Sequence, residues 1–380
     1  MPHIVAHRFA FGSVTSSQAP PPPRPLCASD AAAPGPAAHR YRSTMSTAAG
    51  RLHRRREVMS VGVTDHEIRR RCTGGSWHRV RRGAYAESSV LAGLDTVARH
   101  RLAIAALLPD MACDAVVSHQ SAAVVLGAPM APALLDRVHV TRNRRHGGRI
   151  KANLQVHCAP VDLVAERDTV LVTTPARTIV DLARTVAFEP AVVVGDALCR
   201  DFGVTVAALA AELEAARGRR GIDAARRVID FLDPRSRGVD HSRIRVLLQR
   251  LGLPPAAASG LVHAEDGSVL GSVDLYLEHP GVVLTVDGSG PDTPRADHGA
   301  APADTVLRHY GFHPVRVSWR ELATGTAGYR LQAAVREARA VRPRGFIRPA
   351  PLSGSQPLTS RSLRDRGAAV ETGRPRGRCD

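Results

Sequence analysis

The spacing of hydrophobic and polar residues predicts an α/β protein built from several domains. Near residue 64, Thr64 and Glu67 have the three-residue spacing of a capping box, so we expect a helix to begin at Thr64. Glycines at positions 74 and 75 permit a tight reversal and should end that helix. An antiparallel hairpin should follow, with three side chains facing the core: Trp77, Val80 and Tyr85.

The region 91–235 mixes helix-like and strand-like runs, which predicts an α+β domain. Apolar residues recur at helical spacing between Leu94 and Leu108. We expect further helices after Ser118, from Pro175 at a first helical turn, and then to about Phe231. Short apolar runs predict four strands, at 115–117, 138–140, 154–158 and 171–173, with a polar loop over 142–149.

Two polar features of this region favour structural roles over catalysis. Arg177 and Asp181 lie four residues apart at a helix start, a spacing typical of an intrahelical ion pair. His119 follows Ser118 at the start of another expected helix, where a histidine is usually satisfied by its surroundings. Neither feature indicates an active site by itself.

The region 236–342 has the pattern of a second α/β domain. A helix is expected over 242–251, and Asp266 and Gly267 give a strong two-residue hairpin signal. The continuous apolar run at 281–286 predicts a central strand that is buried on both faces. Adding the helix at 304–309, the strand at 315–318 and the helix at 329–341 gives the order αβββαβα, which suits a small restriction-endonuclease-like core.

Both ends of the chain have a different composition from the rest. Residues 1–48 are rich in Pro, Ala and Ser, and residues 343–380 are rich in Arg, Pro and Ser. Such segments bury too little apolar surface to fold, so we expect a disordered N-terminal extension and a disordered basic tail.

Cysteine usage and hydropathy point to a soluble protein of the cytoplasm. The six cysteines are scattered, with no CxxC pair and no histidine pair at metal-binding spacing, so neither a disulfide framework nor a zinc site is indicated. No apolar run approaches the roughly 18 to 20 residues of a membrane span, so we expect no membrane association.

Charge and motif order together predict a winged helix-turn-helix domain at 49–90. The formal net charge is +17, but Lys151 is the only lysine among the 52 basic residues, so the Arg content partly reflects residue usage. The order of capped helix, Gly-Gly turn and Trp-containing basic hairpin is more specific than charge. We expect these side chains to contact the phosphates of double-stranded DNA: Arg69, Arg70, Arg71, His78, Arg79, Arg81 and Arg82.

Three segments between Thr64 and Asp181 resemble the AbiEi-type antitoxins of type IV toxin-antitoxin systems. They read TDHEIRRRCTGGSWHRVRRGAYA, VVSHQSAAVVLG and VTTPARTIVDLA, and the region from Thr64 to Asp181 that they mark is about a third of the chain. The resemblance implies a winged helix that represses its own operon. It also implies that the domain at 91–235 counteracts a nucleotidyltransferase-like toxin.

Residues from about Ser242 to Val341 resemble the very-short-patch-repair-like endonuclease domain. SRIRVLL, SVDLYL, VVLTVDG and VLRHYGFHPVRVSWREL carry the resemblance. In that superfamily, carboxylates hold a divalent metal that activates water. The resemblance makes Asp274 the strand aspartate, places Thr285 and Asp287 where an acid-x-Lys pair would stand, and puts His241 at a usual glutamate.

The departures from the nuclease motif at His241 and Thr285 favour a DNA-binding regulator or antitoxin whose nuclease-like domain is inactive. DNA binding of this kind needs no cofactor. One alternative is a Mg²⁺-dependent DNA endonuclease that uses Asp274 and Asp287 as metal ligands, with Thr285 and His241 assisting. Another is a pure interaction protein that neutralises a toxin.

Overall fold

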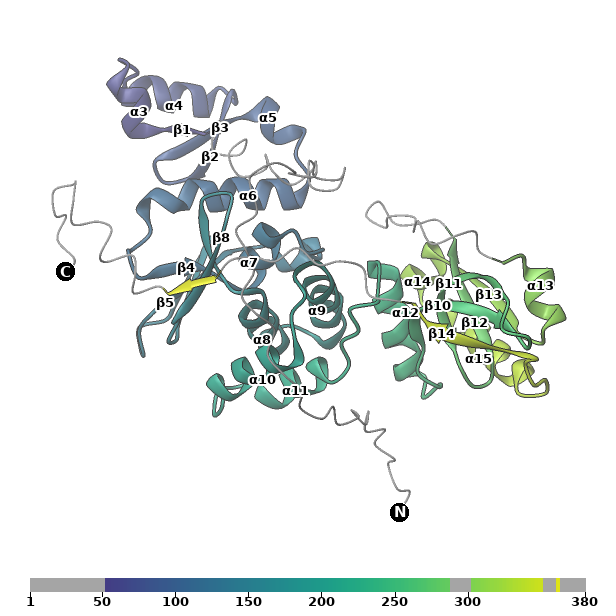
Figure 1. Cartoon of the computed structure of the whole chain (residues 1–380). Coiled ribbons are helices and arrows are strands. Elements are labelled where there is room, and N and C mark those ends of the chain that lie inside the picture. The colour runs from purple at the N-terminus through teal and green to yellow at the C-terminus, as the bar shows by residue number, and fades with distance from the viewer. Residues whose placement is uncertain (1–51, 288–301, 351–359, 363–380) are drawn as a thin grey trace, which may run out of the picture. The chain divides into compact units, whose positions relative to one another are not determined.

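The described part of the chain is mixed α/β, with helices packed on three separate β-sheets (Figure 1). The computed structural model describes residues 52–287, 302–350 and 360–362. The N-terminal extension expected over 1–48 lies outside these ranges, as does most of the expected basic tail. Within the described ranges, no helix is both long enough and apolar enough to cross a membrane.

The first sheet has three strands in the order β1-β3-β2 and carries two helices. Its elements are β1 (His53–Arg54), α3 (Arg55–Ser60), α4 (Asp65–Thr73), β2 (Trp77–Arg81) and β3 (Ala84–Glu87). The predicted start of α4 is confirmed, because Thr64 Oγ1 accepts a hydrogen bond from the Glu67 backbone N–H at 3.2 Å. The Glu67 carboxylate does not complete the capping box; it pairs with Arg70 and Arg71 instead.

Packing of the hairpin follows the expected core positions only in part. Trp77 is buried, with the His53 ring stacked on one side and the Arg71 guanidinium 4.8 Å from its ring centroid. Val80 and Tyr85 are half-buried. Leu52, Ala84 and Ala86 belong to the same hydrophobic cluster as the helices that follow, so this sheet shares a core with the next region.

The second sheet has seven strands in the order β15-β8-β9-β4-β5-β7-β6. Its strands are β4 (Ala115–Val117), β5 (Val138–Arg142), β6 (Arg149–Lys151), β7 (Leu154–Cys158), β8 (Leu163–Arg167), β9 (Val170–Thr173) and β15 (Ser360–Ser362). The four predicted strands are confirmed. The expected polar loop begins within β5 and runs into β6, and β8 is a strand that the apolar pattern did not indicate.

Helices α6 and α7 pack against this sheet, and most of the helices of this region were predicted. They are α5 (Ser88–Ala92), α6 (Thr96–Leu107), α7 (His119–Leu126), α8 (Pro175–Thr185), α9 (Phe188–Phe202), α10 (Val206–Ala215) and α11 (Ile222–Ile229), with short 3-10 turns at Leu108–Asp110 and Pro132–Leu134. Leu102, Leu126 and Ile179 are almost completely buried between them. This core holds the starts of α7 and α8 in place.

The third sheet has the order β13-β12-β11-β10-β14. Its elements are α12 (Val239–Arg250), β10 (Ala257–Ala264), β11 (Val269–Leu277), β12 (Val282–Asp287), α13 (Asp304–His309), β13 (His313–Ser318), α14 (Trp319–Thr324), α15 (Ala327–Ala338) and β14 (Gly345–Pro349). The predicted αβββαβα order is present, with α14 inserted before the last helix. The boundary of the expected tail is wrong, because β14 pairs with β10 from Gly260 to Ala264.

A buried ion pair joins α9 to α12 near the expected domain boundary at residue 236. Arg245 Nη1 lies 2.9 Å from Asp196 Oδ2, and Ser242 Oγ donates to the same oxygen at 2.6 Å. Burial raises the pKa of Asp196 to about 6, although Arg245 opposes this shift.

A buried histidine of α6 should make the fold sensitive to acid. His100 is 4% exposed and its Nε2 lies 2.8 Å from Ser121 Oγ. Burial lowers the pKa of His100 from 6.5 to about 4, although Asp136 opposes the shift. Below pH 6.5, His100 binds a proton in the unfolded chain but stays neutral in the folded chain. The free energy of unfolding therefore falls by roughly 3 kcal/mol as the pH falls from 6.5 towards 4.

We expect His100→Gln to lose this part of the acid sensitivity, because glutamine stays neutral over the whole range. Denaturant unfolding at pH 7 and at pH 4.5 measures the effect. The other buried histidines contribute equally to both proteins, so the difference between the two pH dependences belongs to His100. Parallel curves for the two proteins would contradict the assignment.

Candidate functional site

Residues of the second sheet and its helices line a pocket of about 580 Å³. Residues of β5, β6, β7, α7 and α8 line it, together with Arg219 from the segment after α10. The topology explains this convergence. β4 and β9 are parallel neighbours, so the helices that follow them, α7 and α8, begin at the same edge of the sheet.

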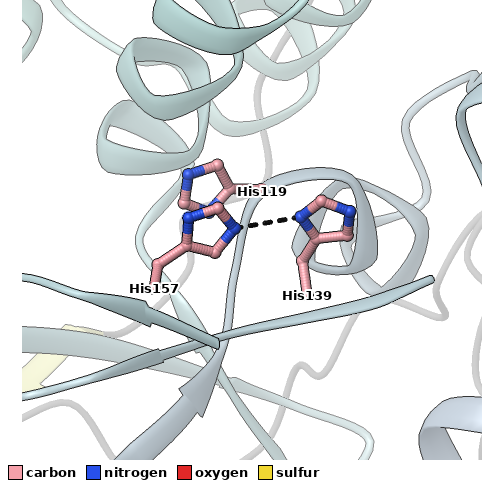
Figure 2. A group of neighbouring side chains, drawn as sticks. All are labelled: His119, His139 and His157. Carbon is pink, nitrogen blue, oxygen red and sulfur yellow. Dashed lines mark hydrogen bonds between the residues drawn. The ribbon is translucent and has the colours of Figure 1, made fainter. Parts of the chain in front are cut away.

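Three histidines meet at this edge (Figure 2). His119 is the first residue of α7, while His139 and His157 lie on β5 and β7. Those strands are parallel neighbours, and the register pairs Thr141 with His157. One nitrogen from each imidazole lies within 4.8 Å of the other two. We call these residues the histidine triad.

The rings of the triad are in close mutual contact. His139 Nδ1 lies 3.1 Å from His157 Nε2, the contact drawn as a dashed line in Figure 2. The rings of His119 and His157 are stacked, with centroids 3.7 Å apart and planes inclined by 12°. His119 and His139 are buried, whereas His157 is half-buried and lines the pocket with His119.

The backbone and a serine fix the orientation of His119. Its φ of 51° lies in the left-handed region, which costs a residue with a side chain on the order of 1 kcal/mol or more. Its Nδ1 lies 3.0 Å from Ser118 Oγ, which also accepts a hydrogen bond from Thr141 at 2.8 Å. Burial lowers the pKa of both His119 and His139 to about 3, so both imidazoles are neutral at neutral pH.

A buried arginine and carboxylate form the floor of the pocket. Arg177 Nε donates to Asp181 Oδ2 at 2.8 Å, and Arg184 Nη1 lies 3.3 Å from Asp181 Oδ1. The intrahelical ion pair predicted for Arg177 and Asp181 is therefore confirmed. Burial raises the pKa of Asp181, but nearby positive charge, including that of Arg177, outweighs it and holds the pKa below its ordinary value.

Arg177 retains an unused donor in this pocket. The residue is 6% exposed, and its Nη2 has no hydrogen-bond partner among the described residues. Its Nη1 donates to the Pro160 carbonyl at 3.2 Å and lies 3.8 Å from Glu212 Oε2. A buried N–H without a partner is costly, and an acceptor supplied by a ligand would satisfy it.

This arrangement can support two kinds of chemistry. Neutral imidazoles whose nitrogens lie this close together can act as ligands for transition metals such as zinc. Arginines are the preferred partners of phosphate and carboxylate anions. Sequence spacing did not indicate either use, because His139 and His157 are 18 residues apart and only the pairing of β5 with β7 brings them together.

The residues expected to contact DNA divide into two groups. Arg69, Arg70, His78, Arg79 and Arg82 are exposed on α4 and the hairpin. Arg71 is half-buried against Trp77 and pairs with Glu67. Arg81 is also half-buried; it lies 2.8 Å from Asp110 and donates to the Ala106 carbonyl at 3.0 Å. The last two therefore contribute to packing.

The residues expected at a nuclease site lie in the third sheet and α12. His241 is buried at the start of α12, and Asp274 and Thr285 are half-buried on β11 and β12. Burial lowers the pKa of His241, while the charges of Asp240 and Asp274 oppose that shift. Asp287 ends β12, and its side chain lies outside the described part. Among described side chains, only the histidine triad groups three metal-ligating atoms.

The chain matches no known protein-family model, and no curated protein matches it significantly.

Removing the Asp181 carboxylate should destabilise the fold strongly. In Asp181→Asn, two guanidinium groups would lose their shared buried counter-charge, so we expect the free energy of unfolding to fall by about 3 kcal/mol. Asp223→Asn is a matched control, because its ion pair with Arg226 is exposed and should contribute less than about 1 kcal/mol. Equal losses in the two variants, measured by denaturant unfolding, would contradict this view of Asp181.

Proposed function

We propose that this protein binds double-stranded DNA through a winged helix formed by the first sheet with α3 and α4. The observation that carries the proposal is the connection between the two helices. They are joined by residues 61–64, which include Gly62 at a φ of 92°. A turn of three or four residues that contains glycine is typical of helix-turn-helix motifs, whose second helix enters the major groove.

The charge on the second helix and the hairpin supports this assignment. Arg69 and Arg70 are exposed on α4, and the basic residues of the hairpin that follows are exposed too: His78, Arg79 and Arg82. Asp65 pairs with Arg55, and Glu67 pairs with Arg70 and Arg71, so the acids of α4 are engaged within the protein. This leaves Arg69, Arg79 and Arg82 as the best candidates for phosphate contacts.

Replacing two of these arginines should weaken DNA binding. We expect Arg69→Ala with Arg79→Ala to lower affinity for a mixed-sequence duplex and to reduce the slope of log K against log salt by about two. The measurement is a fluorescence-anisotropy titration at several salt concentrations.

The matched control removes two exposed arginines from another part of the chain. Arg217→Ala with Arg226→Ala makes the same change in net charge, and both side chains lie on the surface near α10 and α11. The control should keep the salt slope of the unchanged protein. An equal loss of salt slope in the two double variants would show that DNA binding depends on overall charge and would contradict the winged-helix assignment.

We further propose that the domain after the winged helix acts by binding, as the resemblance to AbiEi-type antitoxins implies. In that view the protein is a regulator, and its partner is a nucleotidyltransferase-like toxin. A gene for such a toxin next to this one would support the antitoxin form of the proposal, and co-purification of the two proteins would test it.

An endonuclease is the second candidate function, and the surroundings of His241 favour it. Asp240 and His241 are both 2% exposed, and the charge of Asp274 on β11 acts on the same imidazole. Buried titratable groups of this kind are common in active sites. However, the triad of metal-ligating atoms among the described side chains is elsewhere.

Incubation of supercoiled plasmid with the protein separates the two functions. We expect salt-sensitive DNA binding and no nicking, both with Mg²⁺ or Mn²⁺ and with EDTA. Metal-dependent nicking that is lost in Asp274→Ala would instead establish the endonuclease.

A further inference from the structure

We propose that the histidine triad binds a transition-metal ion of the zinc class, with one coordination position left for an anion from the arginine-lined pocket. This site is separate from the DNA-binding surface and from the residues expected at a nuclease site. Its geometry, its supporting contacts and its surroundings each contribute to the proposal.

The spacing of the His139 and His157 nitrogens fits a shared metal ion. Two zinc–nitrogen bonds of about 2.05 Å at a tetrahedral angle place their nitrogens about 3.3 Å apart. His139 Nδ1 and His157 Nε2 are separated by 3.1 Å. The His119 imidazole stacks on that of His157 and contributes a nitrogen within 4.8 Å of both (Figure 2).

The contacts around the triad resemble those that support metal-bound histidines. A ligating histidine usually donates its second ring N–H to a fixed acceptor, which sets the tautomer and the ring orientation. Ser118 Oγ lies 3.0 Å from His119 Nδ1 and is itself held by Thr141. This contact leaves His119 Nε2 to face the metal. The left-handed backbone at His119 is held at an energetic cost.

The surroundings of the triad explain why an anion would complete the site. Three imidazoles leave one position of a four-coordinate ion to another ligand, as in catalytic zinc sites. Arg149, Arg177, Arg184 and Arg219 line the pocket against the single acid Asp181, so a dication alone would add to an excess of positive charge. An anion would relieve that excess, and the free Nη2 of Arg177 is a donor for it.

Titration of the full-length protein with Co²⁺, after treatment with a chelator, tests the metal site. We expect one tightly bound ion per chain, the intense visible absorption of four-coordinate cobalt, and a rise of several degrees in melting temperature. His157→Gln should weaken this binding by more than the ten- to hundredfold that is lost when a hydrogen-bond partner of a ligating residue is removed. His157 is half-buried, so this change disturbs the core least.

The control variant is His100→Gln. His100 is buried in the same core and contacts Ser121, but it lies outside the triad, so its substitution should leave the cobalt spectrum unchanged. The chain has 17 histidines, and weak binding elsewhere would persist in both variants. A folded protein that binds no stoichiometric ion, or a spectrum retained in His157→Gln, would overturn the proposal.

Azide added to the cobalt-loaded protein tests the open position. We expect the visible spectrum to shift at a saturating azide concentration, because the anion would enter the coordination sphere beside Arg177. A spectrum that azide leaves unchanged would show that no position is open, and this part of the proposal would be wrong.

Discussion

The pocket depends on the ion pairs that the Asp181 carboxylate makes with two arginines. Its two oxygens pair with Arg177 and Arg184. Without this carboxylate the two guanidinium groups would lose their shared counter-charge in a largely buried environment. Arg177 belongs to the first turn of α8, and α8 begins beside α7 because β4 and β9 are parallel neighbours. The ion pair therefore fixes the helix start that faces His119. The same ion pairs of Asp181 thus stabilise the fold and set the geometry of the pocket.

Local patterns predicted most helices and strands, because capping residues, glycines and apolar spacing act within a few neighbouring residues. The Thr64 cap and the Arg177–Asp181 pair are examples that the structure confirms. The histidine triad could not be predicted in this way, since it depends on the register between β5 and β7. Strand β14 was missed for a similar reason: its Arg- and Pro-rich sequence suits a tail, yet its backbone pairs with β10.

Arginine content alone could not separate binding residues from structural ones. The Arg54 guanidinium donates to the Ala105 carbonyl, Arg81 reaches Asp110, and Arg71 covers Trp77. These side chains connect the first sheet to its neighbours and to its own core. Arg69, Arg79 and Arg82 have the same chemistry but are exposed. Only tertiary contacts show which of the charges are available to a polyanion.

The scarcity of lysine has a practical consequence for the pocket. Lys151, the only lysine of the chain, is exposed on β6, directly after Arg149 and Ile150, which line the pocket. An amine-reactive fluorophore would therefore modify one side chain, on a strand that lines this cavity, besides the terminal amine. The protein thus carries a natural attachment point for an optical probe on a strand of the pocket, without any engineered cysteine.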